Sequence, residues 1–208
     1  MELTEFNALQ GIFPIRRLYQ TKESRTFVFI SICAASDSGG MEFKMSDYRW
    51  LKKYSCYDKD YEKNRGKYKH KFTPLSIEEV IRQEKRLGDK FPAELREFYI
   101  QIGFGILGVN NDDFLNLVMS PSDVVDFVLG EGMFENNYCR QDVNLQTKMV
   151  FFDTGDSVYL CLDLEKKDVE GKCPVVYSSG IEYVYMAESL EEFLRKMDES
   201  PNYYDDLW

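Results

Sequence analysis

The sequence predicts an α+β fold in which an antiparallel β-sheet packs against short helices that lie on one of its faces. Short runs of β-branched and aromatic residues alternate with Gly, Asp and Ser, which is typical of strands joined by tight turns. At two places a Ser stands three positions before a Glu, which predicts the start of a helix. Hydrophobic residues make up 44% of the 208 residues, enough for a packed core.

Residues 1–72 are predicted to form an N-terminal extension that contains a β-hairpin. The run 26–35 is β-branched and aromatic, as in a strand. Residues 37–40 have the composition of a turn, and apolar residues alternate with charged ones over 41–45. These three segments together have the pattern of two strands joined by a turn.

The second part of the extension is predicted to be a short helix followed by a connector. We expect Ser46 to cap a helix that continues to Tyr54. Residues 57–71 are charged, rich in Tyr and without periodicity, which predicts an exposed connector. His70, the only histidine, lies among lysines there, so we expect it to be solvated. The tyrosines and lysines could bind single-stranded nucleic acid, but solvation or pairing with the protein's own acids is the favoured interpretation.

Residues 73–208 are predicted to form the main domain. Helix starts are indicated by four sequence features: Ser76 with Glu79, Pro92, Ser120-Pro121, and Ser189 with Glu192. Glycines follow three of these helices: Gly88, Gly103 and Gly130. Strands are predicted at 114–119, 148–152, 157–164, 175–178 and 182–186. Between the third helix and the second of these strands, residues 131–147 are predicted to be a long polar loop.

Charge is distributed unevenly along the chain. Residues 1–72 contain 14 Lys/Arg and 9 Asp/Glu, a net charge of +5, whereas residues 73–208 contain 12 and 27, a net charge of −15. An acidic surface repels phosphate groups and anionic lipids. We therefore expect no nucleic-acid or membrane partner, and a basic protein as the partner instead.

Other features place the protein in the cytoplasm and argue against a metal or cofactor. The N-terminus has no basic segment leading into an apolar run, and no apolar stretch approaches the roughly 20 residues of a membrane helix. The five cysteines form no C-x-x-C pair, which fits reduced thiols. With one histidine and scattered cysteines, a zinc site is not expected.

One short motif has a catalytic counterpart. Asp153-Thr154-Gly155 matches the Asp-Thr-Gly motif of aspartic proteases. In those enzymes two facing carboxylates share a proton. The chain has a single such motif, so only a homodimer could supply the second aspartate. A hairpin turn is the favoured interpretation. We therefore assign no catalytic residue and expect the protein not to be an enzyme.

Three stretches of the main domain carry a resemblance to a known family. The first runs from Leu75-Ser76-Ile77-Glu78-Glu79 through Phe91-Pro92 to Tyr99. The second is 151–163, with Phe-Phe-Asp and Gly-Asp before a strand, and the third joins 174–177 to Ala187-Glu188-Ser189-Leu190-Glu191-Glu192-Phe193-Leu194. In this order, over residues 74–198, they resemble the SUKH superfamily, which includes yeast Smi/Knr-like cell-wall regulators and many bacterial immunity proteins. The chain departs from the family at 102–105 and has no family counterpart before residue 73.

In bacteria the resemblance implies an immunity protein, an antitoxin that neutralises a cognate toxin of a polymorphic or contact-dependent system, often a nuclease. A nuclease must be basic to hold phosphates, so the acidic main domain is complementary to it. The alternatives are a regulatory scaffold like the eukaryotic relatives, and a homodimeric aspartic protease that uses Asp153. Loops carry most binding residues, so the candidate toxin-binding residues are Asp112, Asp113, Phe114, Glu131, Glu135, Tyr138, Asp156 and Glu182.

Overall fold

The computed structural model describes residues 46–109, 115–155, 158–179 and 182–204, together with three short strands nearer the N-terminus. The chain divides into two compact units, Met1–Glu42 and Phe43–Trp208. In the first unit, β1 (Glu5–Phe6), β2 (Leu18–Gln20) and β3 (Phe27–Phe29) form an antiparallel sheet in that order. Apart from β3, the hairpin expected over 26–45 lies outside the described residues.

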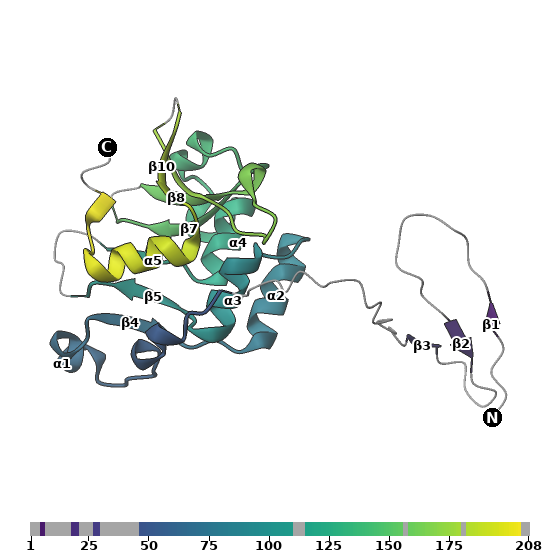
Figure 1. Ribbon diagram of the computed structural model, residues 1–208, viewed down its shortest axis with the longest axis horizontal. Coiled ribbons are helices and arrows are strands. Elements are labelled where there is room, and N and C mark those ends of the chain that lie inside the picture. The colour runs from purple at the N-terminus through teal and green to yellow at the C-terminus, as the bar shows by residue number, and fades with distance from the viewer. Residues whose placement is uncertain are drawn as a thin grey trace. The chain divides into compact units, whose positions relative to one another are not determined.

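The second unit is built on a seven-stranded antiparallel sheet in which neighbouring strands follow one another along the chain (Figure 1). The strands are β4 (His70–Thr73), β5 (Phe104–Leu107), β6 (Leu117–Val118), β7 (Lys148–Asp153), β8 (Tyr159–Asp163), β9 (Val175–Ser178) and β10 (Tyr183–Ala187). This meander confirms the predicted α+β class. It also contains two strands, β4 and β5, that the sequence patterns did not indicate.

Among the described residues, four α-helices begin close to the predicted start residues, whereas α1 (Tyr61–Asn64) was not predicted. The four are α2 (Ile77–Leu87), α3 (Ala93–Gln101), α4 (Pro121–Leu129) and α5 (Leu190–Glu199). The hydroxyls of Ser76, Ser120 and Ser189 each accept the backbone N–H three residues later, at 3.2, 3.1 and 3.1 Å. Gly88 and Gly130 follow α2 and α4 in the left-handed conformation. The serine caps and the left-handed glycines both help to satisfy backbone groups that a helix end leaves unpaired.

Short 3₁₀ helices fill several connections. They are η1 (Arg49–Tyr54), η2 (Arg65–Lys67), η3 (Gly132–Phe134), η4 (Tyr138–Asp142) and η5 (Leu164–Lys166). The short helix expected to end at Tyr54 is present as η1, but Ser46 does not cap it. Instead, the Ser46 hydroxyl donates to Glu94 of α3 at 3.2 Å. The predicted polar loop before β7 contains η3 and η4.

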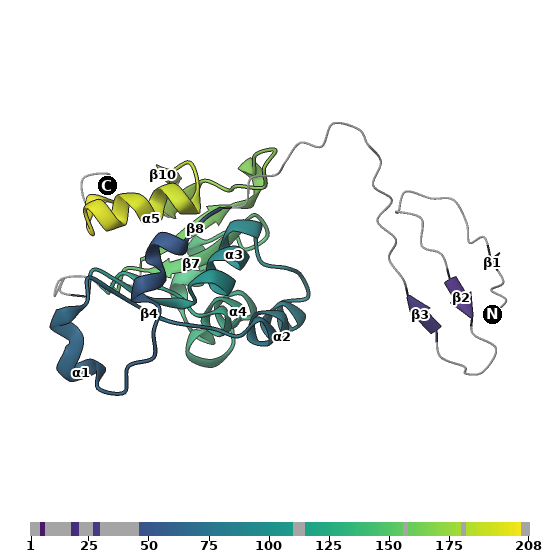
Figure 2. The same ribbon diagram turned by 60° about the horizontal axis from the view of Figure 1, so that its bottom comes forward.

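Helices α4 and α5 cover opposite faces of the sheet (Figure 2). Phe127 of α4 packs on Tyr159 with ring centroids 4.8 Å apart, whereas Phe193 of α5 packs on Phe152 at 5.1 Å. Phe152 is paired with Leu160, the neighbour of Tyr159, and neighbouring residues in a strand point to opposite faces. All residues of β8 are buried. The expectation that the helices lie on one face is therefore wrong.

Residues 46–72 are part of the packed second unit. Tyr48, Leu51 and Phe72 have no exposed surface, and Tyr48 packs edge-on against Phe98 of α3 at 5.3 Å. His70 is also fully buried. The expectation of a solvated His70 is wrong, because His70 lies in β4, which pairs with β5 at the edge of the sheet. Of the residues expected to form an exposed connector, 57–69 are mostly exposed and 70–71 belong to β4. The division between the two compact units falls between residues 42 and 43.

The unusual glycines after α3 allow β4 and β5 to approach each other. Gly103 has a φ of 111° and Gly105 a φ of 149°, which side chains rarely tolerate. A Cβ atom at Gly103 would overlap the carbonyl group of Thr73, and one at Gly105 would overlap that of Lys71. The Ile-Gly-Phe-Gly segment at 102–105 is therefore the start of a strand held close to its neighbour.

Candidate partner-binding surface

Three connections of the meander lie at one end of the sheet, because successive antiparallel strands turn at alternate ends. They join β5 to β6, β7 to β8 and β9 to β10. Most of the loop residues singled out from the sequence fall on these connections. Four of them lie outside the described residues: Asp112, Asp113, Phe114 and Asp156. Glu182, between β9 and β10, is described and exposed.

The loop between α4 and β7 is held against the sheet by buried and hydrogen-bonded side chains. Phe134 is 4% exposed, with ring centroids 5.2 Å from Phe127 and 6.3 Å from Tyr159. The Asn137 side-chain amide donates to the Tyr159 hydroxyl at 3.3 Å. Arg140 Nε donates to the carbonyl of Phe127, at the end of α4, at 2.6 Å. These contacts fix the loop in one conformation.

Between these anchors the loop exposes apolar and acidic side chains. Met133 is 80% exposed and Tyr138 69%, and Leu129 at the end of α4 is 42% exposed. Glu131 and Glu135 are exposed beside them. We call these five residues the loop surface. Tyr and Met are enriched at protein interfaces, and exposed apolar groups held on a fixed loop are typical of a binding surface.

The two acids of the loop surface differ in their surroundings. Arg86 of α2 donates through Nη2 to Asp126 at 2.6 Å and to Glu131 at 2.8 Å. Both hydrogen bonds raise the pKa of Arg86 above its ordinary value, and the bond to Asp126 has the larger effect. Among the described residues no cation lies within ion-pair distance of Glu135. Glu135 is therefore the acid of the loop surface that is open to a cation from a partner.

The hairpin that carries Glu182 contacts the same loop. The backbone N–H of Asn144 donates to the Tyr183 hydroxyl at 2.9 Å, and the Ser178 hydroxyl donates to the carbonyl of Asp142. The structure thus brings together the loop and the β9–β10 hairpin, which are separated by two strands in the sequence. Of the residues singled out from the sequence, it describes Glu131, Glu135, Tyr138 and Glu182, all exposed and on these two elements.

The Asp-Thr-Gly segment has the geometry of a turn. Asp153 is the last residue of β7, and its Oδ1 accepts the backbone N–H of Gly155 at 2.8 Å. The backbone N–H of Thr154 donates to the carbonyl of Val158 at 3.1 Å, which closes the connection to β8. Asp side chains commonly stabilise turns in this way. The hairpin-turn interpretation accounts for all three residues.

Sequence reasoning missed a buried carboxylate, Glu94, which is 4% exposed. Its Oε1 accepts the Ser46 hydroxyl at 3.2 Å, and its Oε2 accepts the backbone N–H groups of Cys173 at 3.2 Å and Leu190 at 3.4 Å. Burial raises the pKa of Glu94. A Glu in the first turn of a helix is ordinarily solvated, so the pattern gave no sign of its burial. Its contacts give it a structural role at the junction of three segments.

The described residues form neither a metal site nor a membrane-spanning helix. Within the part of the chain that the structure describes, no group of three or more His, Cys, Asp or Glu residues is arranged to hold a metal ion. No helix in that part is long and apolar enough to cross a bilayer. The described cysteines, 56, 139, 161 and 173, are free thiols.

Comparison with known proteins places the second unit in a family. The model of the SMI1 / KNR4 family (SUKH-1) matches residues 74–196, which is more than half of the chain. A protein named Immunity protein YxxD, from Bacillus subtilis (strain 168), is 32% identical over 142 residues, covering 65% of this chain and 88% of that protein. No solved structure matches the chain. The extent of both matches shows that the chain belongs to the SMI1 / KNR4 family, SUKH-1.

Proposed function

We propose that this protein is an immunity protein that binds and neutralises a cognate toxin without catalysing a reaction. The observation that carries the proposal is the similarity to Immunity protein YxxD over 88% of that protein's length. The family match agrees with it. The proposal includes the finer expectation that the toxin is basic, as a nuclease is, and belongs to a polymorphic or contact-dependent system.

Charge supports a basic partner. Residues 73–208 have a net charge of −15. Complementary charge steers association, and rates of about 10⁸–10⁹ M⁻¹s⁻¹ are reached at low salt. An inhibitor that binds quickly neutralises a toxin before damage accumulates. The acids of the loop surface and of the β9–β10 hairpin would act at this stage of binding.

Exposed apolar side chains would then hold the complex together. Met133 and Tyr138 stand on a loop that is already fixed by Phe134, Asn137 and Arg140. Binding through such a loop costs little ordering entropy. We therefore assign Met133 and Tyr138 to the centre of the interface, with Glu131, Glu135 and Glu182 around them. In this mechanism the toxin is inhibited because its active site or substrate groove is covered.

The protease alternative has little structural support. An aspartic protease needs two facing aspartates, and Asp153 is engaged in a turn with Gly155. His70, the one histidine, is fully buried, with Nε2 2.7 Å from Asp198 and Nδ1 accepting from Gly108. Both ring nitrogens are therefore occupied by structural hydrogen bonds. A regulatory scaffold, the other alternative, is separated from an immunity protein by the test below.

The test is rescue from toxicity. The toxin domain encoded beside this gene should arrest growth when expressed alone, and coexpression of this chain should restore growth. The purified pair should form a stable complex, and the purified toxin should lose its activity as this chain is added up to one equivalent. A toxic domain that this chain neither binds nor inhibits would contradict the proposal. A stable complex with a non-toxic protein, without rescue, would favour the scaffold.

A further inference from the structure

A second charged surface lies at the β4 edge of the sheet, whereas Glu182 lies beside β10, the strand at the opposite edge. It is formed by η1, α1, η2 and the residues between them. Residues 48–71 contain nine Lys/Arg and three Asp/Glu, a net charge of +6 in a protein whose overall net charge is −10. We call it the basic surface. Its charge is opposite to that of the toxin-binding surface proposed above.

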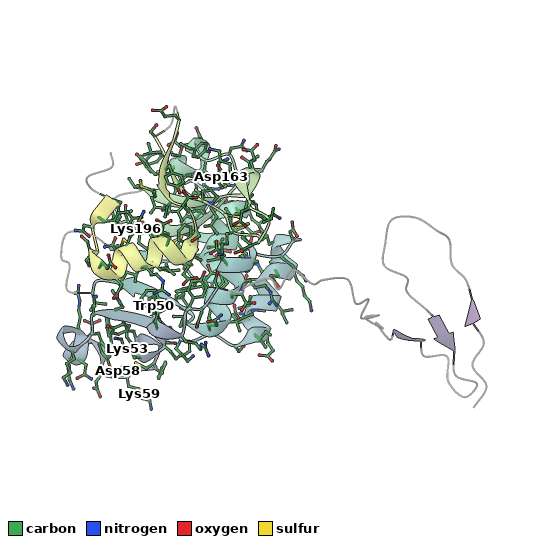
Figure 3. All side chains as sticks on the ribbon, in the orientation of Figure 1. Trp50, Lys53, Asp58, Lys59, Asp163 and Lys196 are labelled. Carbon is green, nitrogen blue, oxygen red and sulfur yellow. The ribbon has the colours of Figure 1, made fainter. Side chains whose placement is uncertain are left out.

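Two parts of this segment lie side by side. The Tyr68 hydroxyl donates to Asp58 at 2.7 Å, and the backbone N–H of Cys56 donates to the carbonyl of Phe72 at 3.2 Å. Residues 56–58 therefore run next to 68–72, so the segment folds back on itself at the β4 edge. Figure 3 shows Lys53, Asp58 and Lys59 together at the edge of the unit where α1 lies.

Internal ion pairs neutralise only part of the basic surface. Among the described residues, three of its cations have a carboxylate partner: Arg49 with Asp47 at 2.8 Å, Lys63 with Asp60 at 3.4 Å, and Lys69 with Asp198 at 2.7 Å. Lys53, Lys59 and Lys67 are exposed, and no carboxylate lies within ion-pair distance of them among the described residues.

Lys53, Lys59 and Lys67, which lack an ion pair among the described residues, remain available at the surface. Lys53 Nζ lies 4.8 Å from the centroid of the Tyr54 ring, and Lys67 donates to the side-chain oxygen of Asn64 at 2.6 Å. Neither contact removes the positive charge. Internal pairing, which the sequence analysis favoured together with solvation for this charged segment, thus accounts for only some of its cations.

An exposed aromatic residue lies within the basic surface. Tyr57 is 78% exposed and lies three residues after the end of η1 and two residues before Lys59. Tyrosine is enriched at protein interfaces because its ring adds contact area while its hydroxyl remains able to form hydrogen bonds. Lysines around an exposed tyrosine are suited to an anionic partner that also has an apolar group.

We propose that the basic surface docks an acidic segment of a partner protein, independently of toxin binding. The choice between a polypeptide and nucleic acid follows from the charge around the surface. A nucleic acid places a charge every few ångströms along its length and would extend onto the acidic remainder of the molecule, which repels it. A short acidic polypeptide fits within the basic surface. The unpaired cations are lysines, which act as point charges, and arginine forks suited to phosphate are not among them.

The test uses the full chain and a short fluorescein-labelled oligoglutamate peptide that ends in tyrosine, with binding followed by fluorescence anisotropy. The wild type should bind the peptide at low salt and release it as salt rises. The triple variant Lys53→Glu, Lys59→Glu and Lys67→Glu should bind about tenfold more weakly, since each exposed ion pair contributes little alone. Tyr57→Ala should weaken binding by a smaller factor. Circular dichroism establishes that each variant is folded.

A matched control variant distinguishes peptide binding at the basic surface from an effect of the protein's overall net charge. Lys85, Lys90 and Lys167 are also exposed and lack ion pairs among the described residues, so their triple change to Glu alters net charge equally. It should change peptide affinity by less than about twofold. Equal losses in both triple variants, or tighter binding of a single-stranded oligothymidine than of the peptide, would overturn the proposal. The Lys53, Lys59 and Lys67 variant should still rescue cells from the toxin; loss of rescue there would contradict the independence of the two surfaces.

Discussion

His70, which is fully buried, and the partly exposed Asp198 form a hydrogen bond that joins β4, the first strand of the sheet, to the last helix, α5. His70 Nε2 lies 2.7 Å from Asp198 Oδ1, and His70 Nδ1 accepts the backbone N–H of Gly108 at 2.9 Å. A nitrogen that accepts a hydrogen bond carries no proton, so the folded protein holds the neutral ring, protonated on Nε2. Burial lowers the pKa of His70 below its ordinary value, although Asp198 acts to raise it.

The first prediction concerns stability near neutral pH. Since the pKa of His70 is lower in the folded protein, the unfolded chain binds more protons below about 6.5, the ordinary histidine value. The contribution of His70 to the free energy of unfolding should therefore be complete above that pH. It should decrease as the pH is lowered toward the folded-state pKa. Urea unfolding between about pH 7.5 and 5.5 measures the slope.

The sequence provides its own control for this prediction. His70 is the only histidine, so the part of the slope that is lost on its substitution can be assigned to this side chain. A His70→Gln variant should be less stable at neutral pH but should lose the slope. An unchanged slope in the variant, or a folded-state imidazole that titrates by NMR at or above 6.5, would contradict the assignment.

The second prediction concerns truncation. A chain that starts at Phe43 retains the whole second compact unit. It should unfold cooperatively with a melting temperature close to that of the full chain. A chain that starts at Thr73 lacks β4 and the fully buried Tyr48, Leu51 and Phe72. We expect it to lose its cooperative thermal transition, measured by circular dichroism. If both truncated chains melt alike, residues 46–72 do not contribute to the core.

The elements that could be predicted from the sequence are those with local signals. Ser76, Ser120 and Ser189 start helices α2, α4 and α5 because a side-chain cap is a contact between near neighbours. β4 has only four residues, two of them His70 and Lys71, and its stability comes from pairing with β5. Tertiary pairing of this kind leaves no local pattern.

The third prediction concerns the glycines that allow this pairing. Gly103→Ala and Gly105→Ala should each cost about 2 kcal/mol or more, because the added methyl group overlaps the backbone of β4 and φ is unsuited to alanine. Gly66 is the control, since nothing lies within 4 Å of a Cβ there. Gly66→Ala should change the free energy of unfolding by less than about 1 kcal/mol. Denaturant unfolding measures all three variants, and equal effects would contradict the close approach of β4 and β5.

The candidate surface could be predicted only in part. The polar loop before β7 was recognised by its composition, and with it Glu131, Glu135 and Tyr138 as candidate binding residues. Met133 and Leu129 were missed, because an isolated apolar residue in a sequence gives no sign of whether it is buried. Within the same loop the structure buries Phe134 and exposes Met133. The distinction depends on α4 and β8, which lie elsewhere in the chain.

The fourth prediction separates the steps of toxin binding. Glu135 is exposed without an ion pair among the described residues, whereas Glu131 is held by Arg86 at 2.8 Å. Glu135→Lys should lower the association rate of the toxin by about threefold or more at low salt and much less at high salt, since salt screens exposed charges. Glu131→Lys should also release Arg86 and lower stability slightly. Glu199→Lys is the control for net charge, because Glu199 is exposed at the end of α5.

The fifth prediction concerns the lifetime of the same complex. Buried anchors at an interface act mainly on the dissociation rate, and a strong one contributes about 2 kcal/mol or more. Met133→Ala and Tyr138→Ala should each raise the dissociation rate of the toxin about tenfold or more, with little effect on association. The matched controls are Val169→Ala and Tyr57→Ala, since both residues are 78% exposed but lie on other segments. Surface plasmon resonance against the purified toxin measures both rates. If the loop variants and the controls dissociate at the same rate, the toxin binds elsewhere on the molecule, and the exposure of Met133 and Tyr138 has another cause.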